Sequence, residues 1–186
     1  LTCGAEVDEF DAEGFTPFRL ACQEGHEHIA LLLINHGCAV HRVDEDGVPP
    51  IFMASPFGRA GVAALLADKG ANIEQAMNDG ATPLYIACQE GHLQVAAVIV
   101  DKGAKIDQVT NGGATALLIA CETGRLKVAA LLVEKGATVD KANNDGGPPL
   151  FVACQQGHVK IAALLADKGA KIDQARANDG CTSLIK

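Results

Sequence analysis

The sequence GATPLYIACQEGH, residues 80–92, recurs in altered form every 33 residues along this chain of 186 residues. Its first glycine returns at Gly14, Gly47, Gly113, Gly146 and, after one inserted residue, Gly180. Two further glycine columns keep the same register, one through Gly25, Gly58, Gly91, Gly124 and Gly157, the other through Gly37, Gly70, Gly103, Gly136 and Gly169. A fixed period of this length is typical of a solenoid, in which stacked repeats share one continuous core.

Each repeat predicts two short helices followed by a hairpin loop. In the third repeat we expect a first helix over residues 82–90, because Thr82 and Pro83 form a favoured helix start. Apolar residues at helical spacing predict a second helix over 92–102, and the polar, glycine-rich residues 104–113 predict the hairpin. Neither helix is long enough to be stable alone, so the repeats must bury their apolar faces against one another.

Several motifs of the repeat resemble those of the ankyrin repeat family, over essentially the whole chain. The family's Thr-Pro-Leu-His motif is similar to Thr82-Pro83-Leu84-Tyr85, and its Gly-His pair occurs at Gly25-His26, Gly91-His92 and Gly157-His158. Its Leu-Leu pair occurs at Leu65-Leu66, Leu131-Leu132 and Leu164-Leu165. The resemblance implies an all-α ankyrin-repeat solenoid, built of helix-turn-helix units joined by β-hairpin loops.

The register divides the chain into five complete repeats with a partial repeat at each end. The complete repeats are residues 11–43, 44–76, 77–109, 110–142 and 143–175. Residues 1–10 match the C-terminal part of a preceding repeat, and residues 176–186 match the start of a further one. We therefore expect further repeats or domains to flank this segment in a longer protein.

The second repeat, residues 44–76, is the most irregular. Pro56 is expected to cut its first helix short. Pro49-Pro50 here, and Pro148-Pro149 in the fifth repeat, replace Thr-Pro and remove a capping hydroxyl. The last position of the tetrapeptide holds no histidine, so the sequence leaves hydrogen bonding there open; it is occupied by Arg19, Phe52, Tyr85, Leu118, Phe151 and Ile185.

Nothing in the sequence predicts catalysis, a cofactor or a metal site. The chain lacks a phosphate-binding loop, the nucleophile-elbow motif Gly-x-Ser-x-Gly and the zinc-binding motif His-Glu-x-x-His. No Cys-x-x-Cys pair or other Cys/His ligand spacing occurs either. We interpret His26, His92 and His158 as residues that form a turn hydrogen bond, rather than as metal ligands or catalytic bases.

The cysteines are interpreted mainly as core residues. One column contains Cys22, Cys88, Cys121 and Cys154, whose neighbouring members should lie one helix layer apart, roughly 8 to 10 Å. This spacing is too wide for an undistorted disulfide, so these residues are expected to be small buried hydrophobes. Cys3, Cys38 and Cys181 lie nearer the hairpins and are predicted to be accessible thiols.

Composition excludes some partners. Aromatic residues make up 4% of the chain and tryptophan is absent, which argues against a protein that stacks nucleobases. The apolar runs are too short to cross a bilayer, so we expect no membrane insertion and a cytoplasmic or nuclear setting.

Acidic residues concentrate at the N-terminal end. Residues 1–46 contain ten of them against Arg19 and Arg42, which accounts for the whole formal net charge of −8. The resemblance implies that hairpin tips and first helices line a concave face, and that face would be acidic here. Nucleic acid is therefore not expected, because phosphate binding requires clustered lysine and arginine. A partner with a basic surface is favoured instead.

Large apolar residues accompany these acids in the first two repeats and at the start of the third. We predict a non-catalytic protein-interaction scaffold that binds a basic and apolar protein or peptide on the concave face and hairpin tips, through Phe10, Asp11, Glu13, Phe15, Glu24, Asp44, Glu45, Asp46, Val48, Phe57, Met77, Asp79 and Glu90. Alternatively, the acids only solvate the tips, and Phe10 and Phe57 fill packing gaps. The chain would then be an architectural spacer or spring within a larger protein.

Overall fold

The computed structural model describes residues 15–41, 43 and 48–172 of the chain. Within these ranges the chain forms helices and no β-strand, so the predicted all-α fold class is confirmed. The helices are α1 (Pro17–Glu24), α2 (Glu27–Asn35), α3 (Pro50–Ala54), α4 (Ala60–Asp68), α5 (Pro83–Glu90), α6 (Leu93–Asp101), α7 (Ala116–Glu122), α8 (Leu126–Glu134), α9 (Pro149–Gln155) and α10 (Val159–Asp167).

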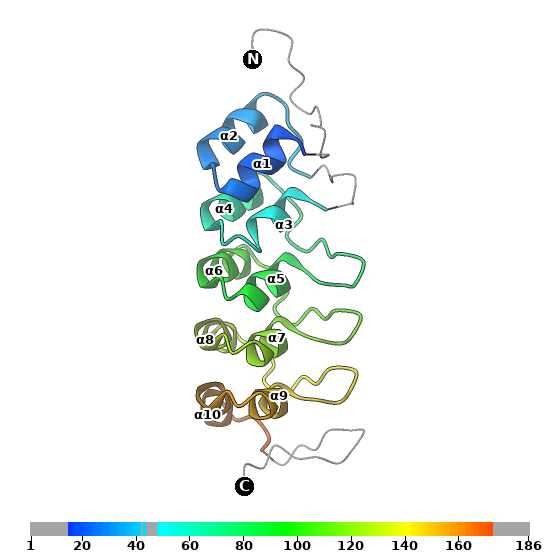
Figure 1. The fold of residues 1–186 in the computed structure, drawn as a ribbon, viewed down its shortest axis with the longest axis vertical. Coiled ribbons are helices and arrows are strands. Elements are labelled where there is room, and N and C mark those ends of the chain that lie inside the picture. The colour runs from blue at the N-terminus through cyan, green and yellow to red at the C-terminus, as the bar shows by residue number, and fades with distance from the viewer. Residues whose placement is uncertain (1–14, 42, 44–47, 173–186) are drawn as a thin grey trace.

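The helices stand in two columns (Figure 1). The odd-numbered first helices of the repeats form one column and the even-numbered second helices form the other. The loops that lead into α5, α7 and α9 extend from the first-helix column, away from the second helices. Each loop ends in a tight turn, such as the one where the Thr110 N–H donates to the Ala114 carbonyl at 3.0 Å. We call the surface formed by the odd-numbered helices and these hairpin loops the first-helix face.

Threonine hydroxyls begin three of the first helices. Thr16, Thr82 and Thr115 each accept a hydrogen bond from the backbone N–H three residues later, at 3.1 to 3.2 Å. This is the usual N-cap contact, and it satisfies a donor that the helix leaves unpaired. The helices α3 and α9 follow Pro49 and Pro148 and have no side-chain cap, as the sequence predicts.

The helix α3 is the shortest in the described structure, with five residues. It stops because Pro56 lacks the N–H that would continue the backbone ladder, which confirms the prediction from the sequence. Ser55 is fully buried beside the break, and its hydroxyl donates to the Ile51 carbonyl at 3.1 Å. A polar side chain thereby satisfies the end of the shortened helix.

Alanine lines the second-helix core. One position of every complete repeat holds an alanine that is at most 5% exposed, namely Ala30, Ala63, Ala96, Ala129 and Ala162. The preceding position is branched and at most 1% exposed in four repeats, as Val62, Val95, Val128 and Ile161. Its equivalent in the first repeat, Ile29, is 48% exposed. This position is therefore buried by the preceding repeat rather than by its own, as the solenoid argument requires.

Side chains at the start of the second helices connect each repeat to the one before it. Arg59 Nε donates to the Gln23 carbonyl at 2.8 Å, and His92 Nε2 donates to the Pro56 carbonyl at 2.7 Å. The same contacts recur from Arg125 to Gln89 at 3.0 Å and from His158 to Glu122 at 3.1 Å. His92 and His158 thus form hydrogen bonds with backbone carbonyls, and the carbonyls belong to the end of the first-helix segment of the preceding repeat.

The glycine column beside these side chains makes room for them. Gly58 has a φ of +70°, and a Cβ there would lie 2.8 Å from Nδ1 of His92. Glycine is therefore required at this position both for its backbone conformation and for the side chain that the next repeat inserts.

Polar ladders join the remaining surfaces of neighbouring repeats. Asparagine side chains link the hairpins, from Asn111 Nδ2 to the Asn78 carbonyl at 2.9 Å and from Asn144 Nδ2 to the Asn111 carbonyl at 2.8 Å. On the second-helix side, Lys135 Nζ lies 2.7 Å from Asp101 Oδ1, and Lys102 pairs with Asp68 in the same way. These exposed ion pairs contribute little to stability, although they recur at the same position of successive repeats.

Repeats 2 and 3 pack differently from their neighbours. The contact between α3 and α5 is much smaller than the contacts of α1 with α3 or α5 with α7, whereas α4 and α6 have the largest contact among neighbouring second helices. At this junction the first helices therefore contribute less, and the second helices more, to the packing between the two repeats.

Candidate functional site

The C-terminal ends of the first helices present an aromatic side chain between two acids. Glu24, Phe57 and Glu90 occupy the same position of consecutive repeats, at or just after the ends of α1, α3 and α5. The Phe57 side chain is 46% exposed, and both glutamates are exposed. The equivalent glutamates follow longer helices and are also exposed, so exposure of Phe57 belongs to this position of the repeat.

The two glutamates have few competing contacts. Glu24 Oε2 lies 3.8 Å from Arg59 Nη2, and its other oxygen accepts from Gln23 Nε2 at 3.3 Å. Glu90 Oε1 accepts from Gln89 Nε2 at 3.2 Å. Because these contacts are long and solvent-exposed, both carboxylates keep most of their ability to attract a cationic partner.

The hairpin of repeat 3 adds an apolar and an acidic side chain to the first-helix face. Met77 is 42% exposed, and its N–H donates to the Ala81 carbonyl at 2.9 Å to close the turn. Asp79 is exposed, and its Oδ1 accepts from the Ala81 N–H at 2.9 Å. Asp79 thus shapes the turn in addition to supplying negative charge.

The other predicted site residues are less available or lie outside the described structure. Phe15 is half-buried, and the Arg19 guanidinium carbon lies 4.2 Å from its ring centroid. Val48 is also half-buried. Six predicted residues lie outside the described residues, namely Phe10, Asp11, Glu13, Asp44, Glu45 and Asp46.

A pocket of about 180 Å³ opens on the first-helix face at the other end of the stack, between α7 and α9. It is lined by side chains that include Glu122, Asn143, Asp145, Phe151, Gln155 and Gln156. The sequence did not predict a pocket at this place. The register could have done so, because α7, α9 and the hairpin between them belong to adjoining repeats.

The comparison with protein families agrees with this geometry. Three overlapping matches to the family described as ankyrin repeats cover residues 1–77, 70–143 and 106–176. The chain belongs to the ankyrin repeat family. None of the curated proteins compared with the chain matches it. Ankyrin repeats generally mediate protein–protein interaction and are generally not catalytic.

The described part of the ankyrin stack contains neither a membrane-spanning helix nor a cluster of metal-binding side chains. No helix there has the length and apolar character needed to cross a membrane. Within the same residues, no group of three or more histidine, cysteine, aspartate or glutamate side chains is placed to hold a metal ion.

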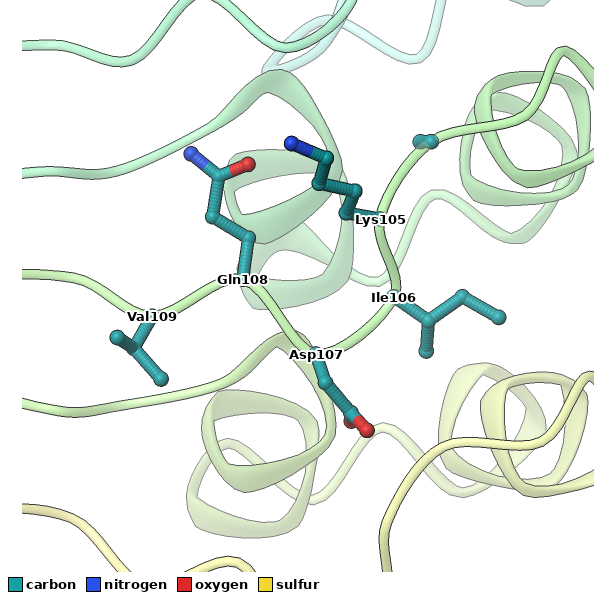
Figure 2. A pocket seen from close by; sticks show the side chains of 6 residues that line it. Lys105, Ile106, Asp107, Gln108 and Val109 are labelled. Atoms are coloured by element: carbon teal, nitrogen blue, oxygen red, sulfur yellow. The ribbon is translucent and has the colours of Figure 1, made fainter.

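A hollow of about 740 Å³ runs along a single segment of the ankyrin stack, residues 104–109 (Figure 2). Lys105 and Gln108 extend to one side of this segment and Asp107 extends to the other. The segment is anchored on both sides, because the Lys105 N–H donates to Glu74 Oε1 at 2.8 Å and Asp107 accepts from the Thr138 N–H at 3.1 Å. We assign these residues to the connection between repeats rather than to a ligand site.

The pKa of Tyr85, which lies in α5, reflects the negative charge of the first-helix face. The pKa of Tyr85 is raised, first by partial burial and then by the negative charges of Glu122 and Asp79. These acids come from two different repeats, so the negative potential extends along the face.

Burial makes the column cysteines inert. Cys22, Cys88 and Cys121 are fully buried as predicted, whereas Cys154 is only partly buried. The prediction of an accessible thiol at Cys38 is wrong, because that side chain is 6% exposed and lies in the core. Burial raises the pKa of Cys22 and of Cys121 to about 12. These thiols stay protonated near neutral pH and are poor nucleophiles.

These shifted thiols predict a loss of stability at alkaline pH. Their ordinary pKa is 9.0, so above that pH the unfolded chain loses protons that the folded chain keeps up to about pH 12. The unfolded state then binds fewer protons, and the free energy of unfolding falls as the pH rises through this window. The urea midpoint should be steady up to about pH 8 and decline above it. The Cys121→Ala variant should decline less steeply; an equal slope would contradict the assignment.

Proposed function

We propose that this chain is a non-catalytic protein-interaction scaffold that binds a partner with basic and apolar side chains on its first-helix face. The observation that carries the proposal is the exposed Phe57 ring between Glu24 and Glu90. A large exposed apolar side chain with acids on both sides fits an apolar residue of a partner whose neighbouring residues are positively charged.

The packing of repeats 2 and 3 supports this location. The helices α3 and α5 contact each other less than α1 and α3 or α5 and α7 do. Met77 and Asp79 lie on the hairpin that leads into α5, so the same junction supplies a second exposed apolar side chain and a further acid. A peptide that crosses from repeat 2 to repeat 3 would contact Phe57 beside Glu90 as well as Met77 beside Asp79.

Charge and apolar contact should affect binding in different ways. Carboxylates at the surface raise the association rate of a basic partner, and salt weakens this effect. An aromatic anchor that becomes buried acts mainly on dissociation and typically contributes about 2 kcal/mol or more. The proposal therefore predicts two separable effects.

The test begins with selection of peptides from a random display library on the parent protein. We expect the selected peptides to carry lysine or arginine beside an apolar residue. Phe57→Gln should then weaken the best peptide about thirtyfold or more, corresponding to roughly 2 kcal/mol, mainly through faster dissociation. Glutamine already occupies this position in repeat 5 as Gln156, so the substitution should be tolerated in the fold. Glu90→Lys should slow association and reduce its dependence on salt.

The matched control is Gln156→Ala, at the same position three repeats later. It should leave the affinity of the peptide unchanged. Selection of acidic peptides, or equal binding by the parent and Phe57→Gln, would contradict the proposed site.

An architectural spacer is the second candidate function, and the inter-repeat ladders favour it. The asparagine, lysine–aspartate and arginine or histidine contacts run from repeat to repeat with the same register. Such contacts would hold flanking segments at a defined separation. If no peptide is selected and none of the variants changes any interaction, the spacer function replaces the binding one.

A further inference from the structure

We propose that Asn111 is a site of spontaneous deamidation, and that its conversion loosens the contact between the hairpins of three neighbouring repeats. Asn111 lies at the tip of the hairpin that leads into α7. This site is separate from the proposed binding surface around Phe57, which belongs to repeats 2 and 3.

Asn111 is the one asparagine of the chain that precedes a glycine. The sequence contains seven asparagines, and the residue after each of the others is histidine, isoleucine, aspartate or asparagine. Deamidation begins when the backbone nitrogen of the following residue attacks the carbonyl carbon of the asparagine side chain. A glycine has no side chain to obstruct this attack, and its backbone rotates more freely than that of other residues.

The reaction needs only water as a co-reactant. Attack of the Gly112 nitrogen on Cγ of Asn111 forms a cyclic succinimide, and the N–H proton is transferred to the amide nitrogen, which leaves as ammonia. Water then adds to one of the two carbonyl carbons of the ring. Aspartate results when the bond from Cγ to the Gly112 nitrogen breaks, and isoaspartate results when the bond from the α-carbonyl carbon to this nitrogen breaks.

Both reacting groups are accessible in the folded chain. Asn111 and Gly112 are exposed at the centre of a tight turn, in which the Gly113 N–H donates to the Thr110 carbonyl at 2.9 Å. Among the described residues, the Gly112 N–H has no hydrogen-bond acceptor. A Cβ on Gly112 would lie no closer than 3.7 Å to the nearest surrounding atom, so there is room for the ring to form.

One contact holds the side-chain amide before it reacts. Asn111 Nδ2 donates to the Asn78 carbonyl at 2.9 Å, and this contact is exposed. A single exposed hydrogen bond contributes little net free energy, because water replaces it when it breaks. It should therefore slow the reaction without preventing it.

Deamidation would disturb the hairpins on both sides of Asn111. Towards repeat 3, the Nδ2 donor disappears, and a carboxylate oxygen then faces the Asn78 carbonyl, which is also an acceptor. Towards repeat 5, the Asn144 N–H donates to the Gly112 carbonyl at 3.0 Å, and Asn144 Nδ2 donates to the Asn111 carbonyl at 2.8 Å. Isoaspartate removes the Asn111 carbonyl from the main chain and adds one carbon to the backbone, so the two acceptors of Asn144 cannot both keep their positions.

The experiment incubates the folded chain in mildly alkaline buffer at body temperature and digests samples with trypsin at intervals. Asn111 is the only asparagine of the tryptic fragment 106–125. We expect this fragment to acquire the mass of aspartate at position 111 and to separate chromatographically into aspartate and isoaspartate forms. Asn78 and Asn144 are internal controls, because they occupy the same position of the adjoining repeats but precede aspartate, and they should stay unconverted over the same period.

Gly112→Asp is the matched variant, because aspartate already occupies this position in the adjoining repeats as Asp79 and Asp145. It should lose most of the conversion at Asn111. No conversion of fragment 106–125 in the parent, equal conversion at all three asparagines, or equal conversion in Gly112→Asp would overturn the assignment of the modification site.

Hydrogen exchange tests the effect on the hairpins. The converted chain carries an additional negative charge, so ion exchange separates it from the parent. Its Asn144 amide should exchange about fivefold faster than in the parent, since one hydrogen bond contributes about 1 kcal/mol. Unchanged exchange at Asn144 in the converted chain would overturn the proposed loosening of the hairpins.

Discussion

Leu117→Ala should lower the free energy of unfolding by about 2 to 5 kcal/mol. Leu117 is fully buried in α7, in the middle of the stack, so its truncation leaves a cavity against both neighbouring repeats. Urea denaturation followed by far-ultraviolet circular dichroism measures the loss. Because each repeat contacts only its neighbours, the transition should also broaden as the two halves of the stack lose their coupling.

Leu20→Ala is the matched control for this substitution. Leu20 lies on α1 and is 40% exposed, so the same change of side chain should cost less than about 1 kcal/mol. Equal losses for the two variants would mean that burial in the stack does not determine the stability of the chain, and the account of the core would be wrong.

Gly113→Ala should destabilise the chain by about 3 kcal/mol, through backbone strain and the loss of hairpin hydrogen bonds. Gly113 has a φ of +77°, and a Cβ there would lie 2.4 Å from Asn144 Oδ1 and 2.7 Å from Asn144 N. Asn144 must therefore move, although its N–H donates to the Gly112 carbonyl and its side chain donates to the Asn111 carbonyl. The substitution breaks the link between two repeats rather than a local turn alone.

Gly103→Ala separates these two costs. Gly103 has a φ of +94°, but a Cβ there would have no atom within 4 Å. Only the backbone cost of about 1 to 2 kcal/mol should appear. Hydrogen exchange at the Asn144 amide should accelerate in Gly113→Ala and stay unchanged in Gly103→Ala. Equal exchange in the two variants would show that the hairpin ladder does not depend on this glycine.

Local chemistry made the helices predictable. The expected first helix over residues 82–90 is observed as Pro83–Glu90, and the second over 92–102 as Leu93–Asp101. Threonine caps, prolines and glycines act on their own neighbours in the chain, so their effect can be inferred without knowing what packs against them. The shortened α3 follows in the same way from Pro56 alone.

The candidate site was only partly predictable, because exposure and contact depend on the neighbouring repeats. The sequence indicated Phe57 and its flanking acids as a candidate, but it left open whether the ring filled a gap. Only the structure showed that the side chain is 46% exposed. The pocket of Glu122, Asp145 and Phe151 combines three elements and was not foreseen.

The sequence by itself therefore determined the repeat, its register, its helix boundaries and the acidic balance of the chain, since each is carried by residue types at fixed spacing. Tertiary structure alone decided which side chains cross between repeats. His92 bonds the Pro56 carbonyl of the preceding repeat, a partner that the sequence did not name. Cys38 is buried in the core, although its place near a hairpin suggested an accessible thiol. The physical reason is that a solenoid buries most of its surface between repeats, so the surroundings of a residue are set by residues about 33 positions away as much as by its own helix.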